Sequence, residues 1–398
     1  MLRILHTEAS RGWGGQEIRI LSEISAMQRR GHRMMLCCAP DSELAKRVNL
    51  PDLPVVHLPF ASNSDIDTVS GLHSLVRRHH LDVVNTHSSI DSWCAAIASV
   101  VLRKTVLVRT RHLSIPVKRN WPTRWLYRQP HSVVTTGEAL RVQLIEQNGL
   151  RSTRTLSIPT GIELGRFDPR AYDGQVVRRE LGIAPDEIVI GTVAMLRGMK
   201  GHRILIDSAP AIVAKHPKVR FLFVGYVTHT STVVDDFKAR MRELGVEDRF
   251  IFAGYRTDIP NVLAALDMVV LPSTRDEGVP QSLTQALCMA KPAVATRVGA
   301  VGEIVRHQQT GLLVAPSDSG ALGEAICTLI EQPELAKTYG DNGRQLVLKH
   351  YGIESMIDAT ERLYARLLAK QPAWPDTEPS PHEPLNANPT SLVQNLKP

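Results

Sequence analysis

Short apolar runs rich in β-branched residues alternate with longer amphipathic segments along nearly the whole chain. The longer segments repeat apolar residues at the spacing of a helix with one buried face, as at Ile20, Ile24 and Met27. Alternating strands and helices predict parallel sheets covered by helices, built twice along this chain. The expected strands lie near Leu2–Thr7, Met34–Cys38, Val55–Leu58, Asp82–Thr86, Thr105–Thr110, Ser132–Thr135 and Thr155–Ile158, and then near Ile188–Val193, Arg220–Val224, Phe250–Phe252, Met268–Leu271, Ala293–Ala295 and Leu312–Val314.

Proline and glycine interrupt this pattern in the middle of the chain and again near its end. No helix or strand period is strong between Pro159 and Pro185, and we interpret this segment as a linker between domains. From Gln371 on, seven of 28 residues are proline, which is typical of a disordered tail. We therefore predict an α/β protein with a doubly wound domain at 1–165, a second at 166–370 whose last helix can cross back to the first, and a tail at 371–398.

The composition, with 43% hydrophobic and 22% charged residues, is that of a soluble globular protein. The N-terminal apolar run is too short for a secretory signal, and no stretch approaches the ~18 uninterrupted apolar residues of a membrane-spanning helix. The five cysteines form no C-x-x-C pair and lie in apolar segments, which is typical of reduced, buried thiols. We therefore expect a cytoplasmic protein.

The net charge of +7 is concentrated in the first half of the chain. Residues 1–170 hold 23 basic and 14 acidic residues, a balance of +9, and the remainder holds 24 and 26, a balance of −2. Segment 117–128 either lies on the anionic inner face of the cytoplasmic membrane or forms a solvated helix whose aromatic residues pack inward. No recognised nucleic-acid-binding module accompanies it, so we expect no nucleic-acid partner. The segment interleaves Lys118, Arg119, Arg124 and Arg128 with Trp121, Trp125 and Tyr127.

The loop after the first expected strand is rich in glycine and reads Gly12-Trp13-Gly14-Gly15-Gln16-Glu17. Such a loop is either a tight turn or a place where backbone N–H groups approach an anionic ligand at the start of a helix. Glu17 stands where the dinucleotide fingerprint G-x-G-x-x-G needs its last glycine, which weighs against a nicotinamide enzyme. The sequence G-x-x-x-x-G-K-[ST] does not occur, which weighs against an ATPase or kinase of that class.

Two loops in the second half combine glycine with charged residues. In the first, Arg197 and Lys200 alternate with Gly198 and Gly201, and these cations either neutralise a diphosphate without a metal or are simply solvated. The other loop, Ser273–Ser282, follows an apolar strand and leads into an amphipathic helix.

Pro280 in this loop suits the first position of the helix, where its missing N–H costs nothing. The free N–H groups that follow favour phosphate charge. Glu277 on the preceding turn either contacts the ligand of those amides or only caps the helix. Gln281 and Gln285 lie one turn apart on the face that points away from the core.

Polar side chains also end two neighbouring strands of the first half. Arg109, Arg111 and His112 close one strand, and His87 follows the other. Ligands of open parallel sheets bind outside the carboxyl ends of the strands, so these side chains are candidates for the acceptor side of a site. Each histidine is either part of that site or an inert residue with its hydrogen bonds satisfied.

Together these motifs resemble the family-four retaining glycosyltransferases of the GT-B fold, and the resemblance spans roughly residues 1 to 369. Two positions depart from the family pattern: Gln285 stands where a second glutamate usually binds the nucleotide ribose, and Thr160 replaces an asparagine of the linker. The resemblance is carried by Gly14-Gly15-Gln16-Glu17, Ile158-Pro159-Thr160-Gly161-Ile162-Glu163 with Phe167, Arg197 with Lys200-Gly201, Glu277-Gly278-Val279-Pro280, and Gly299 with Glu303-Ile304-Val305.

This resemblance implies two Rossmann-like domains facing across a cleft, an N-terminal domain on the acceptor side and a C-terminal domain for the nucleotide-sugar donor. It implies retention of anomeric configuration without a metal or bound cofactor, the nucleotide sugar being a co-substrate. Glu277 and His112 are the implied catalytic residues, and His87, Arg109 and Arg111 lie on the acceptor side. The implied donor-binding residues are Gly14, Gly15, Arg197, Lys200, Tyr255, Arg256, Gly278, Val279, Pro280, Gln281, Ser282, Leu283 and Gln285.

The predicted function is transfer of a sugar to a saccharide or lipid-linked saccharide, in the assembly of a bacterial surface polysaccharide such as lipopolysaccharide, O-antigen or exopolysaccharide. Two alternatives remain at this point: a nucleotide-sugar epimerase of the same fold, and a non-catalytic subunit that binds a nucleotide sugar. A manganese-dependent transferase would need a D-x-D site. Asp65-Ile66-Asp67 fits that string, but we expect it to open a surface helix away from the ligand loops.

Overall fold

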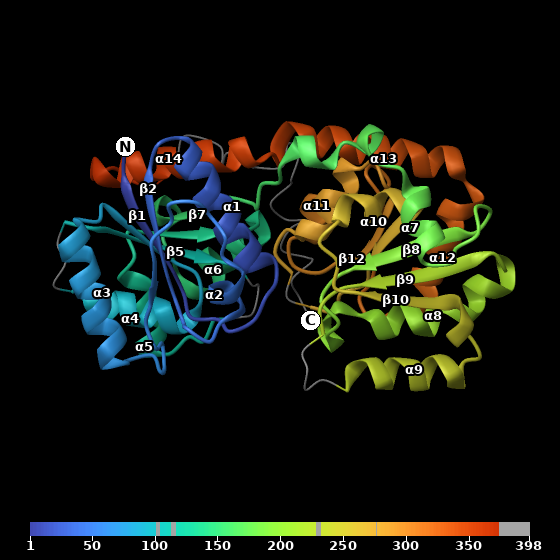
Figure 1. Cartoon of the computed structure of the whole chain (residues 1–398), viewed down its shortest axis with the longest axis horizontal. Helices are drawn as coiled ribbons and strands as arrows, with labels where there is room; N and C mark the ends of the chain where they lie inside the picture. Colours follow the sequence, from blue (N-terminus) through green and yellow to red (C-terminus); the bar gives the residue numbers. More distant parts are fainter. Residues whose placement is uncertain (101–103, 113–116, 228–231, 276, 374–398) are drawn as a thin grey trace. The chain divides into compact units, whose positions relative to one another are not determined.

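The computed structural model describes residues 1–100, 104–112, 117–227, 232–275 and 277–373. It consists of two compact units, each built on one parallel sheet with helices on both faces (Figure 1). Unit 1 comprises Met1–Gly161 and the segment that starts at Ile353, and unit 2 comprises Ile162–Gly352. The predicted α/β class with two doubly wound sheets is confirmed. Of the tail predicted at 371–398, residues 374–398 lie outside the described residues.

The seven-stranded sheet of unit 1 has the order β3-β2-β1-β4-β5-β6-β7, and every pair is parallel. β1 pairs with β2 on one side and β4 on the other, so the winding direction of the sheet reverses between β1 and β4. Its strands are β1 (Arg3–Glu8), β2 (Arg33–Cys38), β3 (Val55–His57), β4 (Val83–Thr86), β5 (Val106–Arg111), β6 (Ser132–Thr135) and β7 (Thr155–Ser157).

Consecutive strand residues of unit 1 feed opposite hydrophobic layers, because side chains alternate across a strand. Ile4 packs in a cluster with helices α1 and α14, whereas Leu5 packs in a second cluster with α3 and α4. Because both faces are covered, the strands are apolar throughout, as is usual in parallel sheets. The helices are α1 (Gly15–Arg29), α2 (Glu43–Arg47), α3 (Ile66–His79), α4 (Ser89–Ser99), α5 (Trp121–Arg128), α6 (Glu138–Asn148) and α14 (Ile353–Leu368).

The six-stranded sheet of unit 2 has the order β10-β9-β8-β11-β12-β13 and is also parallel, with its reversal between β8 and β11. Its strands are β8 (Ile188–Val193), β9 (Val219–Val224), β10 (Phe250–Gly254), β11 (Met268–Leu271), β12 (Ala293–Thr296) and β13 (Leu312–Val314). The helices are α7 (Gly174–Glu180), α8 (His202–Lys215), α9 (Val233–Glu243), α10 (Ile259–Ala265), α11 (Gln281–Cys288), α12 (Ser319–Glu331) and α13 (Pro333–His350).

All thirteen predicted strands are present within one or two residues of their expected bounds. Asp65 precedes α3, so the D-x-D string does open a helix, as predicted. Two local predictions were wrong. The expected linker contains α7, whose Val177 is buried, and Pro280 is the residue before the first turn of α11 rather than its first position. A proline with ψ of 120° does not have helical geometry. All five cysteines are buried and free, namely Cys37, Cys38, Cys94, Cys288 and Cys327.

Candidate active site

Most of the loops predicted to carry chemistry follow the strands at which each sheet reverses direction. The exceptions are Arg109, Arg111 and His112, at the end of β5, and Tyr255 and Arg256, after β10. In unit 2 the strands at the reversal are β8 and β11, and in unit 1 they are β1 and β4. The helices that follow two such strands lie on opposite faces of the sheet, which leaves a crevice at the carboxyl ends of the strands. The topology of each unit therefore places most of the predicted residues where a doubly wound sheet binds its ligands.

Lys200 and Glu277 are in direct contact in unit 2. The Nζ atom of Lys200 donates to Oε1 of Glu277 over 2.5 Å, and the hydroxyl of Ser273 donates to the same oxygen over 2.6 Å. Glu277 is 5% exposed, whereas the side chain of Lys200 is 24% exposed. An acidic side chain is thus held by two donors beside a cation that remains accessible to a ligand.

The two loops that carry this pair are fastened to each other through their backbones. The N–H of Thr274 donates to the carbonyl of Met199 over 2.9 Å. Gly201 has a φ of +71°, and a Cβ atom there would lie 1.7 Å from the carbonyl oxygen of Pro272. Glycine is needed at this position both for its backbone conformation and for the close approach of the loops.

A third loop holds the backbone of Glu277. Its carbonyl accepts a hydrogen bond of 3.0 Å from the N–H of Ala300. At Gly299, where φ is +48°, a Cβ atom would lie 1.9 Å from the same carbonyl oxygen. The loop after β12 thus packs directly on the backbone of Glu277. Only glycine at position 299 allows this close approach.

The first turn of α11 completes this part of unit 2. Gly278, Val279 and Pro280 are buried, as is Leu283, which belongs to the core-facing side of the helix. Gln281, Ser282 and Gln285 are only half-buried, so these polar side chains lie on the face of α11 that points away from the core, as predicted for the two glutamines.

Two further predicted donor-binding positions have different surroundings. Arg197 is exposed, and it forms no ion pair with any residue that the structure describes. Arg256, by contrast, is bound by the carboxylates of Asp258 and Glu180, and these contacts raise the pKa of its guanidinium. Tyr255 beside it is 42% exposed. Of the two arginines, only Arg197 presents an uncompensated charge to a ligand.

In unit 1, helix α1 begins at Gly15, and Gly14 before it has extended backbone. The glycine-rich loop therefore joins the first strand to the first helix, at the position predicted. Beneath it lies Glu8, the last residue of β1, whose carboxylate accepts hydrogen bonds from the side chain of Gln16 and from the N–H of Ser10.

Glu8 is part of a buried acidic group that we did not predict. Burial, with the nearby carboxylates of Asp91 and Glu17, raises the pKa of Glu8 to about 8. Asp91 has a structural role, because it accepts hydrogen bonds from the hydroxyl of Thr7 and from the backbone N–H of His87. The only signal in the sequence was the position of Glu8 at the carboxyl end of a predicted strand.

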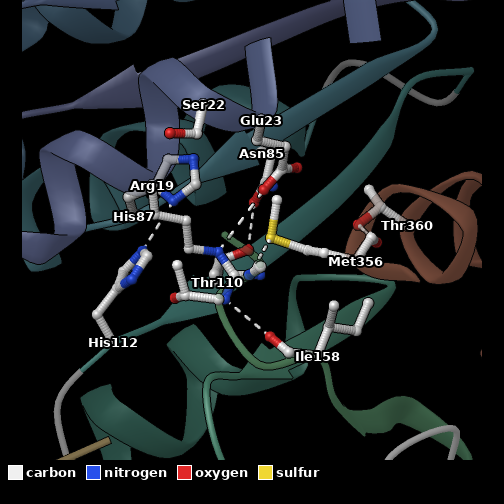
Figure 2. A network of polar contacts seen from close by, with 12 residues as sticks. Arg19, Ser22, Glu23, Asn85, His87, Thr110, His112, Ile158, Met356 and Thr360 are labelled. Carbon is white, nitrogen blue, oxygen red and sulfur yellow. Dashed lines mark hydrogen bonds and ion pairs between the residues drawn. The ribbon is translucent and has the colours of Figure 1, made fainter. Parts of the chain in front are cut away.

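His87 and His112, which follow neighbouring strands, do meet. Nδ1 of His87 lies 3.0 Å from Nε2 of His112 (Figure 2). A third histidine, His6 in β1, was not predicted, and its Nδ1 lies 2.8 Å from Nε2 of His87. Burial is the main reason why the pKa of each of the three rings is lowered. The structure therefore contains a chain of three neutral imidazoles.

The two predicted arginines of β5 pack around one tyrosine of α5. The guanidinium of Arg109 lies over the ring of Tyr127, 4.4 Å from its centroid, and Arg111 donates to the Tyr127 hydroxyl over 3.0 Å. Arg109 is 6% exposed, and burial lowers its pKa. Both residues therefore support α5 from beneath.

The basic segment forms α5, and it has a mixed character. Trp121 is 76% exposed, whereas Trp125 stacks on Trp93 with ring centroids 5.7 Å apart, and Tyr127 is buried. A pocket of about 660 Å³ lies beside α5, and none of the described residues that line it is acidic. The cations that line it are Lys118, Arg119, Arg124, Arg128, Arg151 and Arg154.

Over the part of the chain that the structure describes, no helix combines the length and the apolar character needed to cross a membrane. Over the same residues, no three or more His, Cys, Asp or Glu side chains are grouped as metal ligands.

Comparison with known proteins identifies the class and then the family. Residues 13–166 match the family model described as Glycosyltransferase Family 4, and residues 174–346 match the one described as Glycosyl transferases group 1. The protein is thus a glycosyltransferase. It belongs to glycosyltransferase family 4, as the motifs predicted.

Two of the similar sequences are bacterial glycosyltransferases that are named for a lipopolysaccharide core or a diphosphoundecaprenol-linked sugar. The lipopolysaccharide core biosynthesis mannosyltransferase LpsB of Rhizobium meliloti (strain 1021) is 28% identical over 279 residues, 68% of this chain and 77% of that protein. A UDP-Gal:alpha-D-GlcNAc-diphosphoundecaprenol alpha-1,3-galactosyltransferase of Escherichia coli is 22% identical over 319 residues, 77% of this chain and 81% of that protein.

Solved structures confirm the two-domain GT-B fold. Anabaena Alr3699/HepE, crystallised with UDP and glucose, superposes with a TM-score of 0.81 at 24% identity, covering 92% of this chain and 100% of that one. WaaG, a glycosyltransferase involved in lipopolysaccharide biosynthesis, superposes with a TM-score of 0.69 at 15% identity, covering 92% and 99%.

Proposed function

We propose that this glycosyltransferase uses a nucleotide-sugar donor, retains the anomeric configuration and needs neither a metal nor a bound cofactor. The observation that carries the proposal is the contact of 2.5 Å between Lys200 and Glu277, with the exposed Arg197 on the same loop as Lys200. A diphosphate leaving group develops negative charge as the glycosidic bond breaks. Two cationic side chains on one loop supply the compensation that a divalent metal provides in other enzymes.

The donor would be bound mainly by unit 2. Arg197 and Lys200 bind the diphosphate, and the amides at the start of α11, around Gln281 to Leu283, bind phosphate oxygens and sugar hydroxyls. We keep Gly14 and Gly15 as predicted donor contacts. The base rests near Tyr255, with Arg256 held by its acidic partners as part of the wall.

Gln285 is the proposed ribose contact. Its side-chain carbonyl can accept a hydrogen bond from a ribose hydroxyl, but without the charge of the usual glutamate. The difference is worth about 1 kcal/mol. Solved neighbours hold UDP or UDP-glucose, so we propose a UDP-sugar as the first donor to try.

For the chemical step we favour front-face attack. The acceptor hydroxyl then attacks the sugar from the same face from which the diphosphate leaves, and the enzyme needs no nucleophile of its own. Glu277 orients the sugar and balances charge near its reacting carbon. His112 is the proposed hydrogen-bonding group on the acceptor side, with His87 behind it. Arg109 and Arg111 would act there through α5, because both bind Tyr127. A double displacement would instead require a carboxylate to form a covalent intermediate.

The acceptor is proposed to be a saccharide or lipid-linked saccharide in bacterial surface polysaccharide assembly. The relatives described above are named for lipopolysaccharide core and diphosphoundecaprenol-linked substrates. They are transferases, which favours transfer over epimerisation or simple binding as the activity of this chain.

We further propose that the protein attaches to the anionic inner face of the cytoplasmic membrane through residues 117–128. The supporting observations are the exposed Trp121 and the pocket beside α5 that is lined by six cations. Each basic residue near an anionic surface contributes about 1 kcal/mol. Cosedimentation with anionic and with neutral liposomes at low salt tests this, and equal recovery from both would exclude it.

The activity is tested by incubating the protein with UDP-, GDP-, ADP- and TDP-linked hexoses in EDTA, with and without a saccharide acceptor. Transfer or slow donor hydrolysis supports the proposal. An epimerised donor without acceptor would instead establish the epimerase, and an unchanged but bound donor would establish a binding subunit. Loss of all turnover in EDTA would contradict the metal-independent mechanism.

A further inference from the structure

Three histidines from separate strands of unit 1 form a continuous chain. His6 lies in β1, His87 directly after β4, and His112 directly after β5. Their rings are linked by nitrogen–nitrogen distances of 2.8 Å and 3.0 Å. His6 is fully buried and His87 is 4% exposed, whereas His112 is partly exposed at the carboxyl edge of the sheet. The chain thus runs from the core to the edge where ligands bind.

The two hydrogen bonds of the chain must point in the same direction. Burial lowers the pKa of each ring, and the positive charge of Arg19 lowers it further, so the rings are neutral. A neutral imidazole has one N–H donor and one acceptor nitrogen. His87, in the middle, therefore donates in one bond and accepts in the other.

Glu23 selects the direction. Its Oε1 atom lies 3.9 Å from Nε2 of His6, the end of the chain inside the core. Arg19 lies 3.7 Å from the other oxygen of this carboxylate, Oε2, and donates to the carbonyl of Ile158 over 2.7 Å. A carboxylate attracts an N–H and repels a lone pair, and the charged atom that lies beside Nε2 of His6 is Oε1 of Glu23. Nε2 of His6 therefore carries the proton.

The remaining protons follow from this one. Nδ1 of His6 accepts from Nε2–H of His87, and Nδ1 of His87 accepts from Nε2–H of His112. Nδ1 of His112 is left with a lone pair, and among the described residues no donor is bound to it. Figure 2 shows His112 and His87 in this contact, together with Arg19 and Glu23.

We propose that Glu23, His6 and His87 are positioning residues that fix His112 as the Nε2–H tautomer, so that its Nδ1 accepts a hydrogen bond from a saccharide hydroxyl. The hydroxyl partner rests on the function proposed above, but the tautomer does not. A hydroxyl that donates to Nδ1 has its oxygen lone pairs directed away from His112. The chain thereby sets the polarity of one hydrogen bond at the edge of unit 1.

The tautomer is read directly from long-range ¹H–¹⁵N spectra of the full chain with ¹⁵N-labelled histidine at neutral pH. His131 is an internal reference, because its Nδ1 accepts from the N–H of Leu107 over 3.0 Å and its Nε2 must carry the proton. We expect His6, His87 and His112 to show the pattern of His131. A proton on Nδ1 of His112, or a charged ring, would overturn the proposal.

Two variants of His6 and one of Glu23 separate positioning from packing. His6→Leu removes the acceptor for His87 and should leave His112 as a mixture of tautomers. His6→Asn places an amide oxygen near the position of Nδ1 and should restore the single form. Glu23→Gln, which keeps the size of the side chain and removes its charge, should also give the mixture and serves if His6→Leu does not fold. An unchanged His112 in Glu23→Gln would overturn the proposal.

Turnover with the panel of nucleotide hexoses gives the second readout. His6→Leu should lower kcat by about tenfold, the value of one hydrogen bond of roughly 1.4 kcal/mol, with KM for the donor nearly unchanged. His6→Asn should recover most of it. Normal kcat in a His6→Leu protein with mixed tautomers would refute the positioning role. If the wild type turns over none of these donors, the proposed function fails, while the spectra still decide the tautomer.

Discussion

Lys200 and Glu277 lie 77 positions apart in the sequence, and their side chains meet over 2.5 Å beyond the ends of β8 and β11. Glycines allow the loops around this pair to pack closely. Gly201, next to Lys200, packs on the carbonyl of Pro272, and Gly299, in the loop after β12, packs on the carbonyl of Glu277. The accessible ammonium group is held in place by the less exposed carboxylate. This arrangement keeps a cation ready for an anionic ligand without leaving it unpaired.

Glu277→Gln should reduce kcat about 100-fold or more, because the amide supplies no negative charge near the sugar and binds the Lys200 ammonium without an ion pair. The amide has nearly the same shape, so the fold should persist with an unchanged circular dichroism spectrum. Steady-state turnover measures the effect. Glu324→Gln, on an exposed position of α12, is the matched control. Turnover near that of the wild type in Glu277→Gln would show that the site is misplaced.

Arg197→Ala should also lower turnover by about 100-fold, since it removes a charge that would stabilise the departing diphosphate. Because Arg197 is exposed, its loss should hardly change the melting temperature. Arg203→Ala is the control, for Arg203 is a nearby exposed arginine that pairs with Asp207. Equal activities of the two variants would remove Arg197 from the site.

Gly299→Ala should destabilise the protein by about 2 kcal/mol or more, because φ is +48° and the new Cβ would overlap the carbonyl of Glu277. Gly245→Ala is the control for backbone strain alone, since φ there is +67° and an added Cβ would have no contact within 4 Å among the described residues. Urea denaturation should show the larger loss at Gly299. Equal losses would mean that the close approach has no energetic weight.

Glu8 makes the stability depend on pH. Its pKa is raised from 4.5 to about 8, so the folded chain holds a proton that the unfolded chain releases above pH 4.5. The free energy of unfolding therefore falls between about pH 4.5 and 8. Glu8→Gln removes this dependence. Relative to the wild type, its free energy of unfolding should therefore increase by up to about 1.4 kcal/mol per pH unit in that window. Urea denaturation at about pH 5 and about pH 8 measures the gain; a constant difference would contradict it.

The predictions that succeeded rest on local patterns. Apolar β-branched runs such as Val83–Thr86 located the strands, and the end of each strand located the loops with Lys200, Glu277 and His112. Parallel pairing of β4 with β5 then brings His87 to His112, as adjacent strand ends require.

The failures concern contacts made by distant residues. Nothing near His6 or Glu8 in the sequence indicates that the fold surrounds them with the side chains of His87, Glu23 or Asp91. Burial of polar groups depends on packing between strands far apart in the chain.

Helix α7 was missed because it is short, begins at Gly174 and is followed by Pro185. These two residues suggested a linker. Arg256 is predicted to lie in the donor site, and its pairing with Glu180 across 76 positions could not be read from the sequence.

The central claim is that cations of unit 2 bind a sugar-linked diphosphate without a metal. Isothermal titration calorimetry in EDTA, with UDP-, GDP-, ADP- and TDP-linked hexoses, tests it most directly. We predict that at least one of these donors binds the wild type and binds Arg197→Ala about tenfold or more weakly, while Arg203→Ala binds it normally. Absence of heat with every donor, from folded wild-type protein, would contradict the account.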